Sequence, residues 1–278
     1  AKADQASSKG SPPTSSAPPP GRMNTAHGVA VTVRRHKRPP GSIKYEPSEE
    51  ELADEKFLNH VDSGDHDGAI TMMKQGQQVN VASVRGETPV HKAARRGDAS
   101  FVAQLLSAGA LPDYADVDGV TPVMVAVQFG FNEIVQLLIK KGASLTAKTA
   151  DGSTLLHSAV YGGHEATVDL LLKEQPILDL LEARDANGRT ALQVASYRAP
   201  TSVCELLVKA GADTHATDNR GNTPATLAGR GGRRASKEFL DKVDIEKAAA
   251  MHEAEKHAAS HAPGRRMSGA ARYYNRQH

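Results

Sequence analysis

The middle of the chain repeats one pattern of polar, small and apolar positions at an almost constant interval. Each unit opens on a threonine, continues through a pair of small residues and a turn that begins with glycine, and closes on an apolar pair such as Leu105-Leu106. The opening threonines are spaced by 33, 33, 36 and 33 residues. They are Thr88, Thr121, Thr154, Thr190 and Thr223. Self-similarity at such a period is typical of stacked repeat architectures.

Each unit predicts two short antiparallel helices joined by a turn. Threonine can cap the N-terminus of a helix, and the proline that follows Thr88, Thr121 and Thr223 suits the first helical turn. The glycines accept the left-handed conformation in which helices commonly end. A unit of this size exposes an apolar face that it cannot bury alone, so neighbouring units must stack.

The residues of these units resemble the ankyrin repeat. Its pattern Gly-x-Thr-Pro-Leu-His, Ala-Ala, Gly-His, Leu-Leu and Gly-Ala is matched most fully by the units that start at Gly86, Gly119 and Gly152. The resemblance implies an all-α solenoid of stacked helix-turn-helix units with β-turn tips over residues 86–232, flanked by disordered basic tails and a C-terminal helix. Many unrelated functions use this fold, so function has to be argued from the surface.

The flanking segments differ in composition from the repeats. The Ser/Pro-rich start cannot bury enough apolar surface to offset its ordering entropy, so it should be disordered. Order should resume at Ser48, where Ser48 and Glu51 form a capping box that opens a degenerate repeat. We therefore divide the chain into a disordered Ser/Pro-rich and then basic tail (1–45), an N-terminal capping repeat (46–85), the solenoid (86–232), a C-terminal helix (233–262) and a second basic tail (263–278).

One interval is three residues longer than the others, between Leu172 and Thr190. Gln175-Pro176 stands where the repeat otherwise has Gly-Ala. Two interpretations are open. The extra residues form either a tolerated loop insertion at the edge of the solenoid or a bulge specific to a partner.

No constellation in the sequence indicates catalysis. The reactive-looking histidine column changes from unit to unit, which no catalytic or metal role would survive; the resemblance implies a local hydrogen bond at the helix start instead. The column reads His91, Met124, His157, Gln193 and Thr226. Cys204 falls at an inward position and is interpreted as a small buried hydrophobe. His257 and His261 lie four residues apart without a nearby carboxylate, which indicates a solvated helix face. We expect no enzyme activity, cofactor, metal or small-molecule substrate.

A candidate partner-binding surface lies on the first helix of each unit. The resemblance implies that variable positions of this helix and the turn tips contact partners. Two adjacent columns interleave aromatic and arginine side chains, the types that most often dominate interface energies. The predicted site consists of Arg95, Arg96, Gln128, Phe129, Tyr161, Tyr197, Arg198 and Arg230. We expect this site to bind a protein segment with an acidic or mixed polar and apolar surface.

Positive charge is concentrated outside the repeats. The whole chain carries a net charge of +2, whereas residues 86–232 hold 13 basic and 16 acidic side chains. Residues 21–45 and 263–278 contain no acid. The predicted binders of an anionic surface are Arg34, Arg35, Lys37, Arg38, Arg265, Arg266, Arg272 and Arg276. An acidic protein lattice or RNA would provide such a surface.

Two function classes follow. The first is a non-enzymatic adaptor or scaffold that binds a protein partner on the concave repeat face. The second is a structural subunit of a large assembly, such as a cytoskeletal or axonemal lattice or a ribonucleoprotein, anchored by the basic tails. Ser236 and Ser268 each follow two arginines at positions favoured by basophilic kinases, which makes them phosphorylation candidates. No apolar run is long enough to span a bilayer, and the single cysteine fits a reducing compartment. We expect an intracellular, cytoplasmic or cytoskeletal protein without membrane contact, with mitochondrial and nuclear locations left open.

Overall fold

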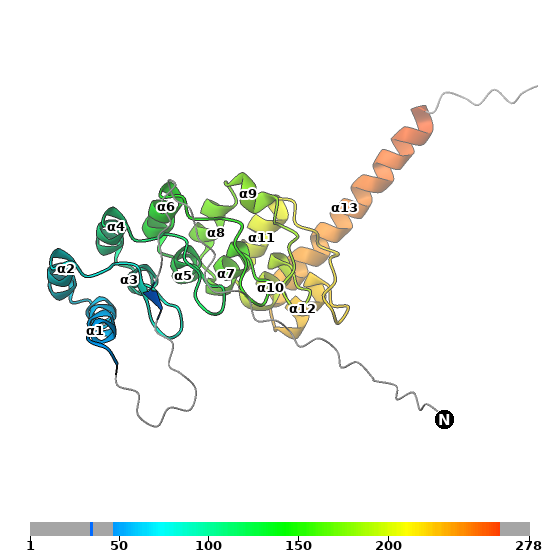
Figure 1. Ribbon diagram of the computed structural model, residues 1–278. Coiled ribbons are helices and arrows are strands. Elements are labelled where there is room, and N and C mark those ends of the chain that lie inside the picture. Colours follow the sequence, from blue (N-terminus) through cyan, green and yellow to red (C-terminus); the bar gives the residue numbers. More distant parts are fainter. Residues whose placement is uncertain (1–33, 36–46, 262–278) are drawn as a thin grey trace, which may run out of the picture.

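The computed structural model describes residues 34–35 and 47–261, which form thirteen helices and two short strands. Figure 1 shows the helices stacked into a solenoid, with the strands at its N-terminal end. The elements are β1 Arg34–Arg35, α1 Glu49–Ser63, α2 His66–Lys74, β2 Val81–Ala82, α3 Pro89–Arg96, α4 Ala99–Ser107, α5 Pro122–Phe129, α6 Asn132–Lys140, α7 Leu155–Gly162, α8 Glu165–Leu171, α9 Gln175–Leu178, α10 Ala191–Arg198, α11 Thr201–Lys209, α12 Pro224–Arg230 and α13 Arg234–His261. This is the all-α solenoid that the resemblance implied.

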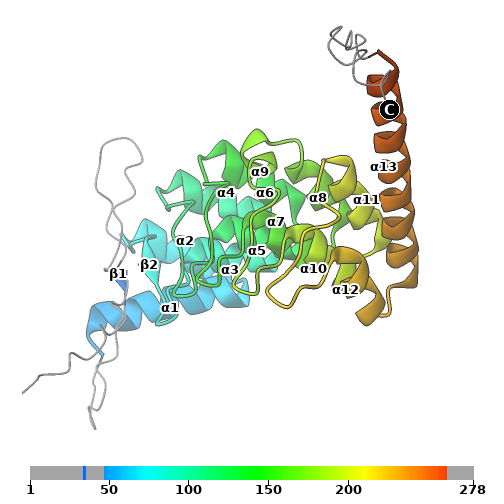
Figure 2. The same cartoon turned by 90° about the vertical axis from the view of Figure 1, so that its right-hand side faces the viewer.

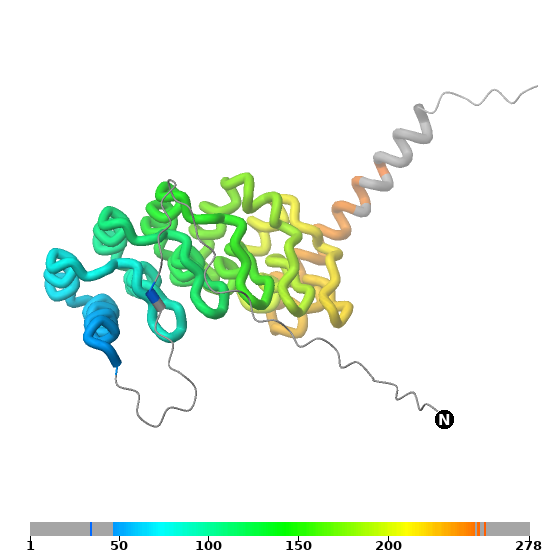
Figure 3. Tube along the Cα trace, in the orientation of Figure 1, coloured from blue at the N-terminus to red at the C-terminus, as the bar shows by residue number. Residues whose placement is uncertain are grey.

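The helices form two rows. The inner row contains α1, α3, α5, α7, α10 and α12, and the outer row contains α2, α4, α6, α8 and α11 (Figures 1 and 2). Each inner helix packs on the inner helix of the next repeat and on the outer helix of its own. The tube in Figure 3 follows this order without a crossover, so every repeat contacts mainly its immediate neighbours.

Short-range signals set where the inner helices begin and end. Thr88 precedes α3 with an extended backbone and forms a capping box with His91, while Pro89 occupies the first turn. Gly97 ends the helix at φ 79°, a left-handed conformation that other residues adopt at a cost. Helices of eight residues are too short to be stable alone, so stacking must stabilise them.

The core runs along the solenoid between the two rows. The equivalent leucines of four outer helices, Leu105, Leu138, Leu171 and Leu207, are all fully buried. Cys204 is fully buried among them, which confirms its interpretation as a hydrophobe. Burial also raises the pKa of its thiol, so the nucleophilic thiolate is disfavoured.

The N-terminal unit carries an ordered segment that the sequence did not predict. The capping box of Ser48 and Glu51 is present at the start of α1. Upstream, β1 pairs in parallel with β2, and Arg34 lies 2.9 Å from Glu50 and 3.6 Å from the buried carboxylate of Asp54. Residues 34–35 were expected to be part of a disordered tail. They are ordered because β2 offers free backbone groups and Asp54 is a buried carboxylate that favours a cation.

The three-residue insertion folds into the short helix α9, at the edge of the solenoid near α8 and α11 (Figure 1). Ile177 of α9 is 1% exposed and belongs to the core. The insertion is therefore more than a loose loop, because it contributes a buried side chain to the packing of its repeat.

Helix α13 leaves the solenoid at its C-terminal end. It begins at Arg234, one residue after the start of the segment predicted for it, and ends at His261. Leu240 is fully buried against the last repeat, whereas Ile245 is 70% exposed. Figure 2 shows the distal part of the helix standing away from the stack. In the part of the chain that the structure describes, no helix is both long and apolar enough to cross a membrane.

Candidate protein-binding surface

The histidines at the starts of α3 and α7 make structural contacts within and between the repeats. His91 Nδ1 accepts a hydrogen bond from the Thr88 backbone N–H at 3.1 Å, and Nε2 lies 3.0 Å from the carbonyl oxygen of Val120 in the next repeat. Burial lowers the pKa of His91 to about 4, so the ring is neutral near pH 7. His157 makes the equivalent contacts to Thr154 and Arg189. The predicted structural role is confirmed.

In the other units, a different residue occupies the position of His91 and His157. Gln193 replaces the histidine and performs both tasks, accepting from the Thr190 N–H at 2.9 Å and donating to the Asn222 carbonyl at 2.7 Å. Met124 can do neither, and the buried hydroxyl of Thr121 has no hydrogen-bond partner among the described residues. The second unit therefore lacks one contact that joins a repeat to its successor.

The predicted partner-binding columns place three aromatic side chains in solvent. Phe129, Tyr161 and Tyr197, which we call the aromatic row, are 44%, 52% and 47% exposed at the C-terminal ends of α5, α7 and α10. The Arg198 guanidinium lies 4.1 Å from the centroid of the Tyr161 ring. This cation–π contact joins two neighbouring repeats and orients the tyrosine.

The arginines at the N-terminal end of these columns are engaged within the solenoid. Arg95 forms an ion pair with Glu87, and Arg96 donates to the Asp62 carbonyl oxygen at 2.9 Å. Burial disfavours the charge of Glu87, but the hydrogen bond and charge of Arg95 outweigh that effect and keep the carboxyl pKa below its usual value. Arg230, at the other end, is exposed.

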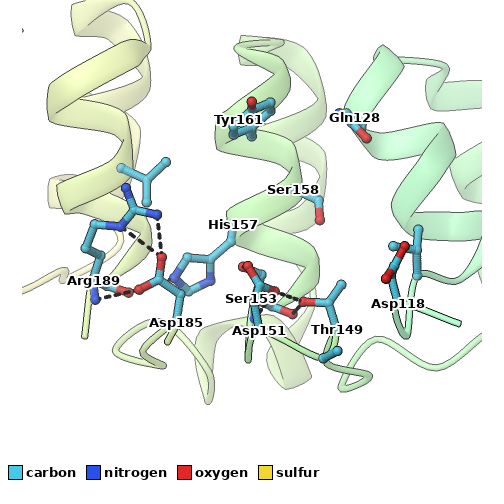
Figure 4. A pocket seen from close by; sticks show the side chains of 13 residues that line it. Asp118, Gln128, Thr149, Asp151, Ser153, His157, Ser158, Tyr161, Asp185 and Arg189 are labelled. Carbon is cyan, nitrogen blue, oxygen red and sulfur yellow. Dashed lines mark hydrogen bonds and ion pairs between the residues drawn. The ribbon is translucent and has the colours of Figure 1, made fainter. Parts of the chain in front are cut away.

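A groove of about 430 Å³ lies between the inner helices and the turn tips that precede them. Figure 4 shows Gln128 and Tyr161 on the helices along one side, and Asp118 and Asp151 on the tips along the other. The groove is lined by Asp118, Val120, Gln128, Thr149, Ala150, Asp151, Ser153, His157, Ser158, Tyr161, Asp185, Arg189 and Val194. The structure thus brings Gln128 and Tyr161 of the predicted site to one cavity.

The tip aspartates were missed at the sequence level. Asp118 and Asp151 both stand three residues before the threonine of their unit, and turn tips were recognised as contact positions. Only the helix columns were compared, however, so a comparison of the tip column would have found them. In the groove, Asp185 is neutralised by Arg189 at 2.6 Å. Asp151 is held by its hydrogen bonds to Thr149 and Ser153, which keep its pKa below the usual value.

Most of the predicted anionic-surface residues lie outside the described residues. They are Lys37, Arg38, Arg265, Arg266, Arg272 and Arg276. The phosphorylation candidate Ser268 also lies outside the described residues. For Arg35, the structure describes only the strand backbone. Arg34 already faces Glu50 and Asp54. Ser236 is 1% exposed, with its hydroxyl 3.0 Å from that of Thr201, so a kinase could reach it only after the start of α13 opens.

Within the described residues, no group of three or more His, Cys, Asp or Glu side chains is arranged to hold a metal ion. The arrangement is suited to contacts with another macromolecule. It offers exposed rings, an arginine stacked on one of them and a groove lined by residues of several repeats.

Comparison with known proteins agrees with the fold. The chain is similar to one chain of a solved complex of the Bd0816 predatory endopeptidase from Bdellovibrio bacteriovorus with immunity protein Bd3460. The TM-score is 0.62 at 22% identity, covering 71% of this chain and 99% of that one. The family model for ankyrin repeats (3 copies) matches residues 58–149 and 145–218, more than half of the 278 residues. The chain therefore belongs to the ankyrin-repeat family.

Proposed function

We propose that this protein is a non-enzymatic adaptor or scaffold that binds a protein partner along the inner face of its repeats. The exposed aromatic row carries the proposal. Three large rings, each about half exposed, stand on consecutive inner helices. They are not buried in the core of the protein, as most large apolar side chains of the repeats are. Rings carried on a rigid scaffold lose little conformational entropy on binding.

The neighbouring side chains support the same conclusion. Arg198 holds the Tyr161 ring, so this part of the surface is organised before a partner arrives. Members of the family are generally non-enzymatic interaction modules. The similar solved chain also comes from a complex of two proteins. The second class, a lattice or ribonucleoprotein subunit, would depend on tail residues outside the described part of the chain.

Site-specific photo-crosslinking tests the proposal. A photoreactive phenylalanine analogue replaces Tyr161 or Tyr197 in the full chain, and as a control it replaces Glu133, which is exposed on the outer helix α6. We expect one protein to be crosslinked from both inner positions and not from position 133. Binding of that purified protein should weaken by more than about 1 kcal/mol for each of Tyr161→Ala and Tyr197→Ala.

A partner captured equally from position 133, or binding that is unchanged in both alanine variants, would reject the inner face as the site. The thermal unfolding midpoint of each variant is measured in parallel. Both rings are half exposed, so we expect their truncation to leave the fold intact.

A further inference from the structure

The groove beneath the aromatic row has an excess of negative charge. Its charged lining residues are Asp118, Asp151, Asp185 and Arg189, while His157 is neutral because its burial lowers the pKa of the ring. Asp185 and Arg189 form an ion pair and cancel each other. Two lining carboxylates, those of Asp118 and Asp151, therefore remain without an ion pair among the residues that the structure describes.

The backbone joins the two turn tips that carry these carboxylates. The N–H of Ala150, next to Asp151, donates to the carbonyl oxygen of Asp118 at 2.7 Å, so the two tips are joined directly. Both aspartates are exposed. The Asp151 carboxylate accepts from the Ser153 hydroxyl at 3.1 Å, which orients it without neutralising its charge. Opposite charge on a partner would thus meet one oriented carboxylate, that of Asp151, and a second carboxylate on the adjoining tip.

The tips of the other repeats show that this charge is local. The equivalent tip residues are Arg85 in the first unit, Asn187 in the fourth and Arg220 in the fifth, and all three are exposed. Along the row of tips, the charge therefore runs from positive through two negative positions to neutral and positive. A bound segment with one basic position would be fixed in register by this pattern, because any shift brings its charge next to Asn187 or an arginine.

The helix side of the groove combines the Tyr161 ring with the polar side chains of Gln128 and Ser158 (Figure 4). Tyr161 projects from α7 above the tips (Figure 4), and Val194 of α10 also lines the groove. A segment lying in the groove would contact carboxylates on one side and a ring on the other. Extended chains direct successive side chains to opposite sides, so one segment can satisfy both.

We propose that the groove holds an extended segment of a partner protein that places a lysine or arginine side chain between Asp118 and Asp151 and an apolar side chain against Tyr161. This inference rests on the proposed function and specifies which side chains the bound segment of the partner carries. It differs from the expectation drawn from the helix columns, which favoured an acidic or mixed segment. The arginines of those columns are largely engaged, with Arg95 paired to Glu87 and Arg198 stacked on Tyr161.

Peptide selection on the full chain tests the inference. A phage library of random twelve-residue peptides is selected on the immobilised protein, and enriched peptides are synthesised. Their binding is then measured by fluorescence anisotropy. The test variant is Asp118→Asn with Asp151→Asn, which removes both charges. Its turns should persist, since Asn187-Gly188 occupies the same tip position naturally.

A matched control removes two charges elsewhere. Glu133→Gln with Glu205→Gln changes exposed residues of the outer helices α6 and α11. We expect enriched peptides to contain lysine or arginine, with binding about tenfold weaker for the double asparagine variant and within about twofold for the control.

The inference is overturned if enriched peptides lack basic residues, or if their affinity survives loss of both aspartates while Tyr161→Ala with Tyr197→Ala abolishes binding. In that second case the proposed function stands and only the partner chemistry is wrong. Enrichment of no peptide also overturns the inference, whereas the proposed function is judged separately by the crosslinking experiment.

Discussion

Replacing Met124 by histidine should stabilise this protein, although it puts a polar ring into a fully buried position. Met124 occupies the place of His91 and His157 in its unit, and the hydroxyl of Thr121 is buried without a partner. By analogy with the first and third units, an imidazole at this position would accept from Thr121 and donate to the carbonyl oxygen of Ser153. The Ser153 carbonyl precedes the next threonine, as those of Val120 and Arg189 do.

The magnitude follows from three contributions. Two new hydrogen bonds contribute about 1 kcal/mol each, and satisfying the buried hydroxyl removes a penalty of roughly 1–3 kcal/mol. Against this, burying the neutral imidazole and losing the apolar contacts of methionine costs on the order of 2 kcal/mol. The expected net gain is about 1–3 kcal/mol, or a rise of about 2–12 °C in the unfolding midpoint.

Urea unfolding followed by circular dichroism at pH 8 measures the gain. Met124→Leu is the control, because it keeps the volume and supplies no hydrogen bond. In a double-mutant cycle, Thr121→Val should abolish the benefit of the histidine, since the two groups act as a pair. A histidine variant no more stable than the leucine variant, or a gain that persists with Thr121→Val, would refute the reasoning.

Three further predictions concern stability. The pKa of His91 falls from about 6.5 in the unfolded chain to about 4 in the folded protein. The stability that depends on the neutral ring is therefore complete above pH 6.5 and is lost as the pH falls towards 4, by roughly 3 kcal/mol in total. His91→Gln should flatten this part of the curve of unfolding free energy against pH, and an unchanged slope would contradict the assignment. Gly162→Ala should destabilise the protein by more than about 2 kcal/mol in chemical unfolding, because the added Cβ would lie 2.2 Å from the backbone oxygen of Gln128. Gly229→Ala, whose added Cβ has its nearest contact at 3.5 Å, should be neutral or stabilising. Equal effects of the two substitutions would disprove the clash. Ile177→Ala should cost about 2–4 kcal/mol in the same assay if α9 is part of the core, and a loss below 1 kcal/mol would show that the insertion is dispensable.

Local and periodic features could be read from the sequence. The caps at Thr88 and Thr154, the buried position of Cys204 and the repeat boundaries depend on residues a few positions apart or on the same place in the next unit. The exposure of Tyr161 and Tyr197 followed from their column in the repeat. In a solenoid each unit packs mainly on its neighbours, so a pattern that recurs along the chain translates almost directly into three-dimensional packing.

Other features depend on which side chains meet across units. Arg198 stacks on Tyr161, and Arg34 reaches Asp54 in the N-terminal unit. The ordered conformation of residues 34–35 could not be inferred from composition, because the composition of a tail does not show whether a strand edge and a buried carboxylate elsewhere in the fold can bind it. Likewise, the burial of Ile177 became evident only from the path of the insertion.

The sequence by itself determined the family, the repeat architecture, the helix caps and the column of aromatic side chains that a partner can reach. Only the tertiary structure decided the chemistry of the groove, which places Asp118 and Asp151 on one side and Tyr161 on the other, while Asp185 forms an ion pair with Arg189. The physical reason is that helices and caps arise from interactions over one to four residues. Which charged residues share one groove, in contrast, depends on the stacking of turn tips some 30 residues apart, although the Asp185–Arg189 pair within that groove spans only four residues.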